Sequence, residues 1–247
     1  MVYDLVPHTD SFGKTDHGLK RPNNEDAFIV QPDLGFCAVA DGMGGAAAGE
    51  LASAIFIETT LEVFSKSHER SERGVLELVQ MAFRYANERI LSHVKENPQH
   101  QGMGCTAELL AYCKESFVIG HIGDSRIYRV REGHLKQVTE DHSLVQDQLN
   151  KGLITPEEAK NHKMRNVILR AVGINENMAV DFIRGQTSQY DLFLLCSDGL
   201  TDMVDDVTIQ KTLSSPSSLS HKVADLIELA KSNGGYDNIT VVLSEIL

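Results

Sequence analysis

The sequence predicts an α+β protein in which antiparallel sheets are covered by helices. Short runs rich in Val, Ile, Phe and Tyr recur along the 247 residues and are bounded by turn-forming residues. Longer stretches carry apolar residues with the period of an α-helix. Two of these helical stretches follow one another directly between strands, so the chain lacks the regular strand–helix alternation of a parallel sheet.

The predicted strands are short and apolar, with turn-like flanks. They cover residues 27–30, 35–40, 106–111, 117–122, 126–130, 178–183, 192–196 and 239–243. The predicted helices are amphipathic and cover residues 46–64, 75–94 and 217–233, the last of which ends at a Gly-Gly pair that is typical of a helix stop. Residues 143–173 are polar with short-helix character, and we expect them to leave the sheets as a flap.

Composition and charge exclude several functional classes. Hydrophobic residues make up 42% and charged residues 23% of the chain, which is typical of a globular domain. The formal net charge of −12 argues against binding to nucleic acid or to anionic membranes. No apolar run could cross a bilayer and the first ten residues do not form a signal peptide, so we expect a cytoplasmic protein. The four cysteines, none in a Cys-x-x-Cys pair, are expected to be buried reduced thiols.

Acidic residues stand beside turn-forming residues at the ends of several predicted strands. Taken singly, each such acid is explained as part of a turn. Taken together, carboxylates delivered to one edge would repel one another unless a cation lay between them. Mg²⁺ or Mn²⁺ fits such oxygen ligands, whereas the ten histidines show no paired spacing for zinc. These acids are Glu25, Asp26, Asp41, Asp124, Asp198, Asp202 and Asp237.

Other phosphate chemistries are excluded by spacing. Gly13-Lys14-Thr15 resembles the end of a P-loop, but the residue five positions before Gly13 is His8 rather than glycine. No cysteine is followed by arginine six residues later, which excludes a cysteine-nucleophile phosphatase. The chain also lacks the Asp-x-Asp pair of aspartyl-phosphate hydrolases and the loop of an EF-hand.

Six segments in order carry a resemblance to a known family. The segments RPNNEDAF, VADGMGG, GMGCTAELL, GHIGDSRIY, LCSDGLTD and GGYDNITVV resemble those of the bacterial metal-dependent protein phosphatases of the 2C type. The resemblance spans nearly the whole chain. It implies a single domain over residues 1–247, built as a four-layer α-β-β-α sandwich. It also implies a two-metal centre at one edge, with residues 143–173 as a flap beside it.

The same resemblance implies roles for individual residues. Asp41 would bridge two Mn²⁺ or Mg²⁺ ions, and the carbonyl of Gly42 would bind one of them. Asp198 and Asp237 would complete the shell of the other ion, whereas Asp124 and Asp202 match a third, weaker site. Glu25 and Asp26 are adjacent on a strand, so they point to opposite faces: at most one binds a metal directly and the other holds metal-bound water. Arg21 matches the arginine that binds the substrate phosphate.

The implied function is hydrolysis of phosphoserine and phosphothreonine on proteins by a metal-bridged hydroxide, in opposition to a bacterial Ser/Thr kinase. We expect a monomer that binds phosphoproteins. The alternatives are a phosphatase dedicated to an anti-sigma-factor antagonist and a non-catalytic module that docks phosphoproteins.

The proton donor to the leaving group is left open, because Met43 stands where some relatives have histidine. A metal-bound water or another histidine such as His142 could serve, although His142 is expected to be structural. Arg126 is expected to pair with a nearby acid.

Overall fold

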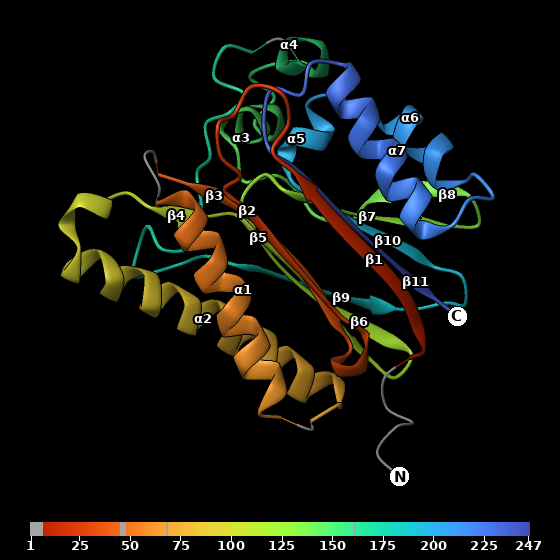
Figure 1. The fold of residues 1–247 in the computed structure, drawn as a ribbon, viewed down its shortest axis with the longest axis horizontal. Helices are drawn as coiled ribbons and strands as arrows, with labels where there is room; N and C mark the ends of the chain where they lie inside the picture. The colour runs from red at the N-terminus through yellow and green to blue at the C-terminus, as the bar shows by residue number, and fades with distance from the viewer. Residues whose placement is uncertain (1–6, 45–47, 68, 161) are drawn as a thin grey trace.

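Two antiparallel sheets pack face to face in the computed structural model, which describes residues 7–44, 48–67, 69–160 and 162–247 (Figure 1). The first sheet has the strand order β1-β11-β10-β7-β8. Its strands are β1 (Thr9–Asp16), β7 (Arg126–Arg131), β8 (His134–Gln137), β10 (Leu192–Cys196) and β11 (Ile239–Ile246). The second sheet has the order β2-β3-β5-β6-β9, with β4 paired to β3. Its strands are β2 (Asp26–Gln31), β3 (Phe36–Met43), β4 (Gly104–Cys105), β5 (Ala107–Cys113), β6 (Ser116–Ile122) and β9 (Asp181–Gln186).

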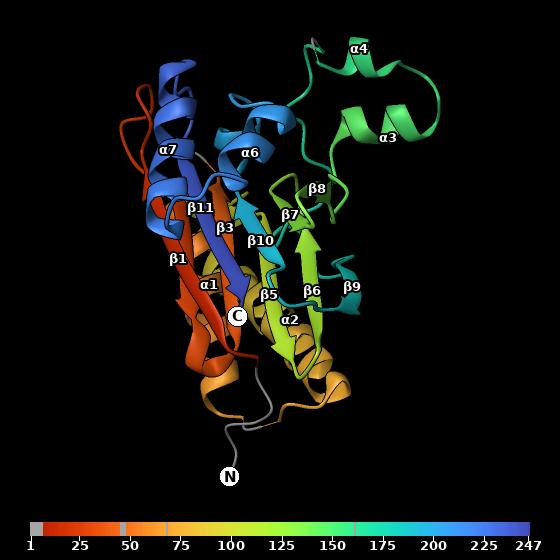
Figure 2. The ribbon, with the colours of Figure 1, turned by 90° about the vertical axis from the view of Figure 1, so that its right-hand side faces the viewer.

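Helices cover the outer face of each sheet, which confirms the four-layer α-β-β-α arrangement (Figures 1 and 2). On the second sheet lie α1 (Gly49–Ser65) and α2 (Glu72–Glu96). On the first lie α5 (Asp198–Thr201), α6 (Asp206–Leu213) and α7 (Leu219–Ser232). The short helices α3 (Leu144–Asn150) and α4 (Pro156–Lys160) project away from the sandwich, as Figure 2 shows. Two 3₁₀ turns, Pro32–Leu34 and Pro98–His100, complete the described elements.

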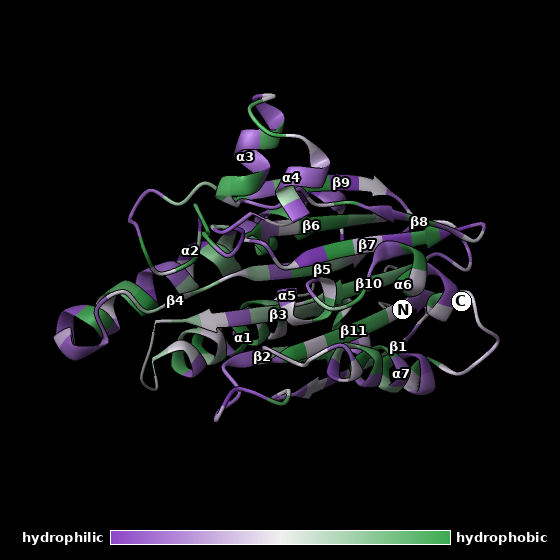
Figure 3. Cartoon of the chain, turned by 90° about the horizontal axis from the view of Figure 1, so that it is seen from above, coloured by the Kyte–Doolittle hydropathy of each residue, from purple (hydrophilic) through white to green (hydrophobic). Residues whose placement is uncertain are grey.

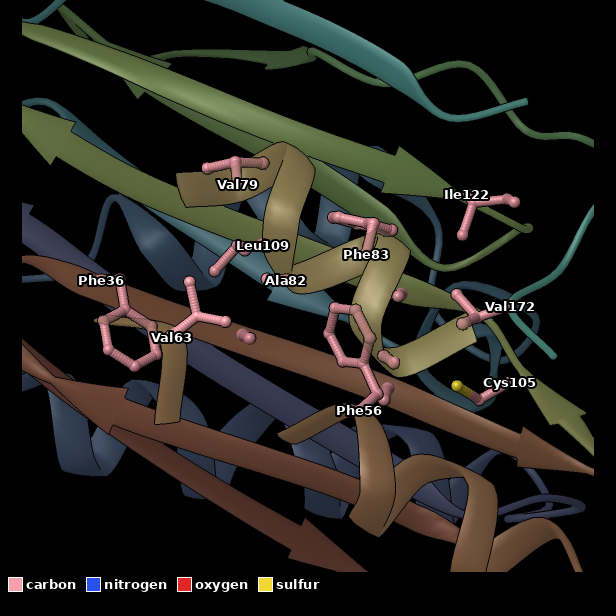
Figure 4. Packing of buried hydrophobic residues seen from close by; sticks show 14 of the residues in the cluster. Phe36, Phe56, Val63, Val79, Ala82, Phe83, Cys105, Leu109, Ile122 and Val172 are labelled. Atoms are coloured by element: carbon pink, nitrogen blue, oxygen red, sulfur yellow. The ribbon is translucent and has the colours of Figure 1, made fainter. Parts of the chain in front are cut away.

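Each interface between layers has its own apolar core. Between the helices α1 and α2 and their sheet, the rings of Phe56 and Phe83 meet edge to face with centroids 5.0 Å apart (Figure 4). Between the sheets lie alternate residues of facing strands, among them Val39, Leu110 and Phe193. Seen from above in Figure 3, the covering helices change repeatedly between hydrophobic and hydrophilic residues, as helices with one buried face do. None of the described helices is both long and apolar enough to span a membrane.

The strand at residues 192–196 has the predicted bounds, but other elements differ from the prediction. The strands β1, β4 and β8 were not predicted because they are polar or very short. The strand β9 begins at residue 181 instead of 178. In the described residues the first helix begins at residue 49, and residues 46 and 47 of the predicted helix lie outside them. The helices α5 and α6 were also missed, since eight residues or fewer give little periodicity to recognise.

Candidate metal centre

Strand direction brings the predicted acids to one end of the sandwich. Within the second sheet, Asp26 begins β2 directly opposite Asp41 near the end of β3. The strand β6 runs parallel to β3, because both are antiparallel to β5, so the turn holding Asp124 lies at this same end. In the first sheet, Asp198 follows the end of β10 and Asp237 precedes the start of its antiparallel neighbour β11. Both sheets therefore deliver carboxylates from the connections at a single edge.

Asp26 points into the interface between the sheets. Its Oδ2 accepts hydrogen bonds from the Ser197 hydroxyl (2.8 Å) and the Thr240 hydroxyl (2.6 Å) of the other sheet. Its Oδ1 is buried and has no hydrogen-bond partner among the described residues. Asp26 thus joins the two sheets with one oxygen and leaves the other free for a ligand.

Asp41 is held by its backbone. The hydroxyl of Thr106 accepts from the Asp41 amide (3.2 Å) and lies 2.7 Å from the hydroxyl of Ser125. The amide of Thr106 in turn donates to the Asp41 carbonyl (2.9 Å). These contacts fix the Asp41 main chain without using its carboxylate. The contacts of Thr106, Ser197 and Thr240 were not predicted, although all three lie within the quoted segments, because a hydroxyl side chain does not reveal in the sequence which group it will meet.

The carboxylates interact strongly enough to shift one another's protonation. Burial raises the pKa of Asp41 well above its usual range, and the charges of Asp26, Asp198, Asp124 and Asp237 raise it further. Burial and neighbouring acids likewise raise the pKa of Asp198 well above its usual range. The pKa of Asp26 is raised by burial to about 6, and that of Asp124 to about 7 by burial and by Asp141. Each shift arises first from burial of the carboxylate, and neighbouring negative charges add to it.

These residues fit a hard divalent cation in the chemistry of their donor atoms. Within the described ranges, the Oδ1 atoms of Asp26, Asp124 and Asp198 are buried and have no hydrogen-bond partner. An orphaned buried carboxylate is costly in a protein, and oxygen ligands are the ones that Mg²⁺ and Mn²⁺ prefer. In the part of the chain that the structure describes, no group of three or more acidic, histidine or cysteine side chains is placed so that it could hold a metal ion. The fit to a cation therefore rests on the chemistry of the donor atoms gathered at this edge.

Gly42 is constrained by its neighbours. A Cβ atom at this position would lie 2.1 Å from the Gly49 carbonyl oxygen and 2.5 Å from that of Glu25. Both contacts are with backbone, which cannot rotate away. The amide of Gly42 donates to the Glu25 carbonyl (3.1 Å), so this turn, the start of α1 and the start of β2 are packed backbone against backbone.

We expect Gly42→Ala to lower the free energy of unfolding by about 3 kcal/mol, because the added methyl group overpacks this turn. Urea unfolding of the metal-free protein measures the change. Gly102→Ala is the matched control, since a Cβ there meets no described atom within 4 Å and the strain comes from its φ of +88°. Gly102→Ala should lower the free energy of unfolding by about 1 kcal/mol. Equal losses in the two variants would contradict the close packing at Gly42.

Glu25 and Asp26 point to opposite sides, as predicted for adjacent residues. The Glu25 carboxylate lies against the first residue of α1, where its Oε2 is 2.5 Å from the position of a Cβ on Gly49. Burial raises the pKa of Glu25, while Arg21 lowers it. Glu25 therefore borders the acidic edge from outside the sandwich, whereas Asp26 lies within it.

Arg21 lies on the loop between β1 and β2, beside the acids. Its Nη2 donates to Asp237 Oδ2 at 2.7 Å, and its side chain is half exposed. Arg21 is thus close enough to the acidic edge to meet a phosphate there. The direct pairing with Asp237 was not predicted, because the two residues are 216 positions apart.

The acids predicted for a third ion lie on the side of α3 and α4. Asp202 follows Asp198 by one helical turn and lies 3.5 Å from Arg165, which belongs to the segment 143–173. Asp202 also raises the pKa of Asp124, after the larger contributions of burial and Asp141. Asp124 and Asp202 are therefore neighbours on one flank of the cluster.

Two other predicted residues have structural contacts. Arg126 forms two hydrogen bonds with Asp141, at 2.8 and 2.7 Å, which confirms the expected pairing. His142 Nδ1 accepts from the Gly123 amide (3.2 Å), and its Nε2 faces Asp181 at 3.3 Å and Arg170. Both ring nitrogens of His142 are engaged, so its contacts are those of a structural residue. Met43 ends β3, paired with Gly104 of β4.

A buried ion pair lies beneath the cluster. Glu108 and His121 face each other across β5 and β6, fully buried, with Oε1 2.5 Å from Nδ1. His121 Nε2 is 2.8 Å from the Glu140 carbonyl and must donate to it, so a second proton lies between Nδ1 and Oε1. Burial opposes the charged ring, but Glu108 raises the pKa of His121 to about 9. Glu108 and His121 were not recognised from the sequence, because their 13-residue separation matches no motif.

Comparison with known proteins identifies the chain. A family model described as protein phosphatase 2C matches residues 15–244. The chain belongs to the protein phosphatase 2C family. All of the acids described above, together with Arg21, fall within the matched residues of this 2C-family chain.

Curated relatives carry names that specify the family further. The serine/threonine protein phosphatase PstP of Mycobacterium tuberculosis is 38% identical over 234 residues, which are 95% of this chain and 44% of PstP. The serine/threonine phosphatase stp of Listeria welshimeri is 36% identical over 236 residues, or 94% of both proteins. The chain thus spans less than half the length of the mycobacterial relative and nearly all of the Listeria one.

Solved structures of the 2C family have the same fold. The catalytic domain of PstP in complex with two manganese ions matches with a TM-score of 0.89 and 36% identity, covering 98% of this chain and 99% of that one. Stp1 from Staphylococcus aureus matches with a TM-score of 0.92 and 31% identity, covering 99% and 97%. These matches confirm the predicted sandwich.

Proposed function

We propose that this 2C-family chain is a metal-dependent protein phosphatase that hydrolyses phosphoserine and phosphothreonine. The observation that carries the proposal is the buried carboxylate cluster, which holds three unpartnered oxygens beside the half-exposed Arg21. A phosphatase needs positive charge where an anionic substrate reacts, and a chain with a net charge of −12 must gather it locally. The names of the relatives, and the two manganese ions of the PstP structure, support this function.

The acids have distinct parts in the proposed site. Asp41, Asp198, Asp237 and the Gly42 carbonyl would hold two Mn²⁺ or Mg²⁺ ions, and Asp124 with Asp202 would hold a third. Asp26 and Glu25 would bind through water. When bound, the ions supply a water of lowered pKa and positive charge for the phosphoryl oxygens.

The chain's own residues place the substrate. Arg21 presents a planar guanidinium with several N–H donors, which can bind two phosphoryl oxygens at once. A phosphate at this position would replace the Asp237 carboxylate as the partner of Nη2. The hydrogen bonds from Ser197 and Thr240 would hold the Asp26 carboxylate in one orientation, which favours a productive geometry at the site.

The cellular role follows from the same proposal. Phosphorylated proteins would be the substrates, and the opposing enzyme would be a bacterial Ser/Thr kinase. The enzyme would work in the cytoplasm as a monomeric single domain, with residues 143–173 as a flap over the edge where Arg165 meets Asp202. Hydrolysis of a small aryl phosphate with Mn²⁺, abolished by EDTA, tests the activity. A protein that binds Mn²⁺ yet hydrolyses neither an aryl phosphate nor a phosphopeptide would instead be a docking module.

Arg21→Lys is expected to reduce kcat/KM for an aryl phosphate about a hundredfold, because lysine keeps the charge but loses the two-point contact with phosphate. Steady-state kinetics at saturating Mn²⁺ measure the change. Arg73→Lys is the matched control, since this arginine is exposed on α2, where it pairs with Glu77. Near wild-type kinetics of Arg21→Lys would contradict the assignment of Arg21 to the phosphate.

The metal-free protein should lose stability as pH rises from about 4, near the unfolded pKa of aspartate, to about 7. Because the folded-state pKa values of Asp26 and Asp124 are raised to about 6 and about 7, folding retains protons that the unfolded chain releases. This stabilisation is complete at pH values below the unfolded pKa and disappears as pH rises through the raised values. Thermal unfolding in EDTA measures it. Added Mn²⁺ should raise the midpoint more at pH 8 than at pH 5.5, whereas an EDTA form that is most stable at pH 8 would contradict the clustering of the acids.

A further inference from the structure

Two large apolar side chains are exposed beside Arg21. Leu19, two residues before it, is 58% exposed, and Tyr236, which precedes the partner of Arg21, Asp237, is 60% exposed. A single exposed apolar side chain on a protein surface has no special meaning. Here two of them come from segments far apart in the sequence and meet at the same turn. Lys20, between Leu19 and Arg21, is also exposed.

The backbone under these side chains is held firmly. The Asn238 side-chain amide donates to the carbonyls of His17 (3.1 Å) and Asn23 (2.9 Å), and so ties down both ends of the loop that carries Leu19 and Arg21. In the middle of the loop, the Leu19 amide donates to the Gly235 carbonyl at 2.8 Å. The exposed side chains therefore stand on a rigid support, which reduces the entropy lost when a ligand binds.

Glycines bring the two segments into contact. Gly18 has a φ of +73°, and a Cβ there would lie 2.2 Å from the Asp237 carbonyl oxygen. The Leu19 side chain covers Gly235, with its Cγ 3.0 Å from the position of a Cβ. The ring of Tyr236 covers Gly234 in the same way, at 2.6 Å. Leu19 and Tyr236 thus lie over neighbouring glycines of one turn and form an apolar ledge at the edge of the site.

We propose that Leu19 and Tyr236 form a subsite for an apolar side chain of the phosphoprotein substrate, close in sequence to the phosphorylated residue. The inference rests on the proposed function, because it takes Arg21 as the phosphate contact. Residues two apart in a chain span at most about 7 Å, so the ledge is reached by a substrate residue one to three positions from the phosphoserine or phosphothreonine. Burying a leucine against Leu19 and the Tyr236 ring removes apolar surface of both partners from water.

The test compares phosphothreonine peptides that carry leucine or alanine at each of the three positions on either side, in an otherwise neutral sequence. For the wild-type protein with Mn²⁺, kcat/KM for the leucine peptide should exceed that for the alanine peptide about fivefold to tenfold at one or two positions. Leu19→Ser and Tyr236→Ser should each bring this ratio towards one. Leu19→Met keeps the apolar volume and should retain the preference.

Tyr190→Ser is the matched control. Tyr190 is 67% exposed and lies two residues before the start of β10. Asp198 lies beyond the other end of that strand. The ratio of kcat/KM for the leucine peptide to that for the alanine peptide should be the same in Tyr190→Ser as in the wild type. A wild-type ratio near one at every position would overturn the subsite, as would a preference that survives both Leu19→Ser and Tyr236→Ser. Wild-type protein that hydrolyses no aryl phosphate would refute the proposed function itself, and this inference with it.

Discussion

Asp41→Asn is expected to lower Mn²⁺-dependent hydrolysis of an aryl phosphate by about a thousandfold or more. Asp41 is buried and its pKa is raised further by the charges of Asp26, Asp198, Asp124 and Asp237, so it lies within the cluster. An amide keeps its shape and one oxygen but loses the charge that a cation requires. Initial rates at a series of Mn²⁺ concentrations measure the loss and show whether added metal restores any activity.

The same change should stabilise the metal-free protein. Burial and the charges of Asp26, Asp198, Asp124 and Asp237 all oppose a charged Asp41, and an uncharged amide avoids that cost, so the melting midpoint in EDTA should rise while the gain from Mn²⁺ falls. Asp33→Asn is the matched control, because Asp33 is exposed at the other end of the β2–β3 hairpin. Asp33→Asn should change neither the melting midpoint in EDTA nor its rise on addition of Mn²⁺. Near wild-type turnover in Asp41→Asn would disprove the central role of Asp41, and a less stable metal-free form would argue against the repulsion.

His121→Leu is expected to lower the free energy of unfolding by about 3–5 kcal/mol, the usual cost of leaving one member of a buried ion pair alone. The Glu108 side chain has no exposed surface, and its Oε2 has no hydrogen-bond partner in the part of the chain that the structure describes. Without His121 the carboxylate must either stay charged in an apolar interior or take up a proton. Urea unfolding at neutral pH measures the difference.

A double replacement shows whether the loss of stability in His121→Leu comes from the unpaired Glu108. Glu108→Leu combined with His121→Leu removes both polar groups and should be more stable than His121→Leu alone. The stability that the double variant still lacks relative to the wild type includes the lost hydrogen bond from His121 to the Glu140 carbonyl, just before the segment 143–173. If the double variant were no more stable than His121→Leu, the cost would not arise from an unpaired Glu108.

Local sequence carries enough information for the apolar strands and the site acids. The run 192–196 has the predicted bounds because it is apolar throughout and its ends are fixed by Asp191 and Ser197. Some of the acids follow a strand and others precede one. Because neighbouring antiparallel strands run in opposite directions, the end of one strand lies beside the start of the next, so these acids meet at one edge. The opposite orientations of Glu25 and Asp26 likewise follow from strand geometry.

Contacts between distant segments could not be predicted in the same way. The strand β1 is polar and becomes a strand through its pairing with β11, more than 220 residues later. The roles of Asn238 in holding the loop before β2, and of Thr240 in binding Asp26, depend on which strands lie side by side. A sequence shows that these residues are polar, but the register between sheets decides what they contact.

Release of phosphate from a phosphothreonine peptide, followed as Mn²⁺ is removed and returned, tests the central claim most directly. The carboxylate cluster predicts turnover with Mn²⁺, its loss in EDTA and its recovery when Mn²⁺ is added in excess. Turnover that continues unchanged in EDTA, or no phosphate release from protein with Mn²⁺ bound, would contradict a metal-dependent phosphatase centred on Asp41.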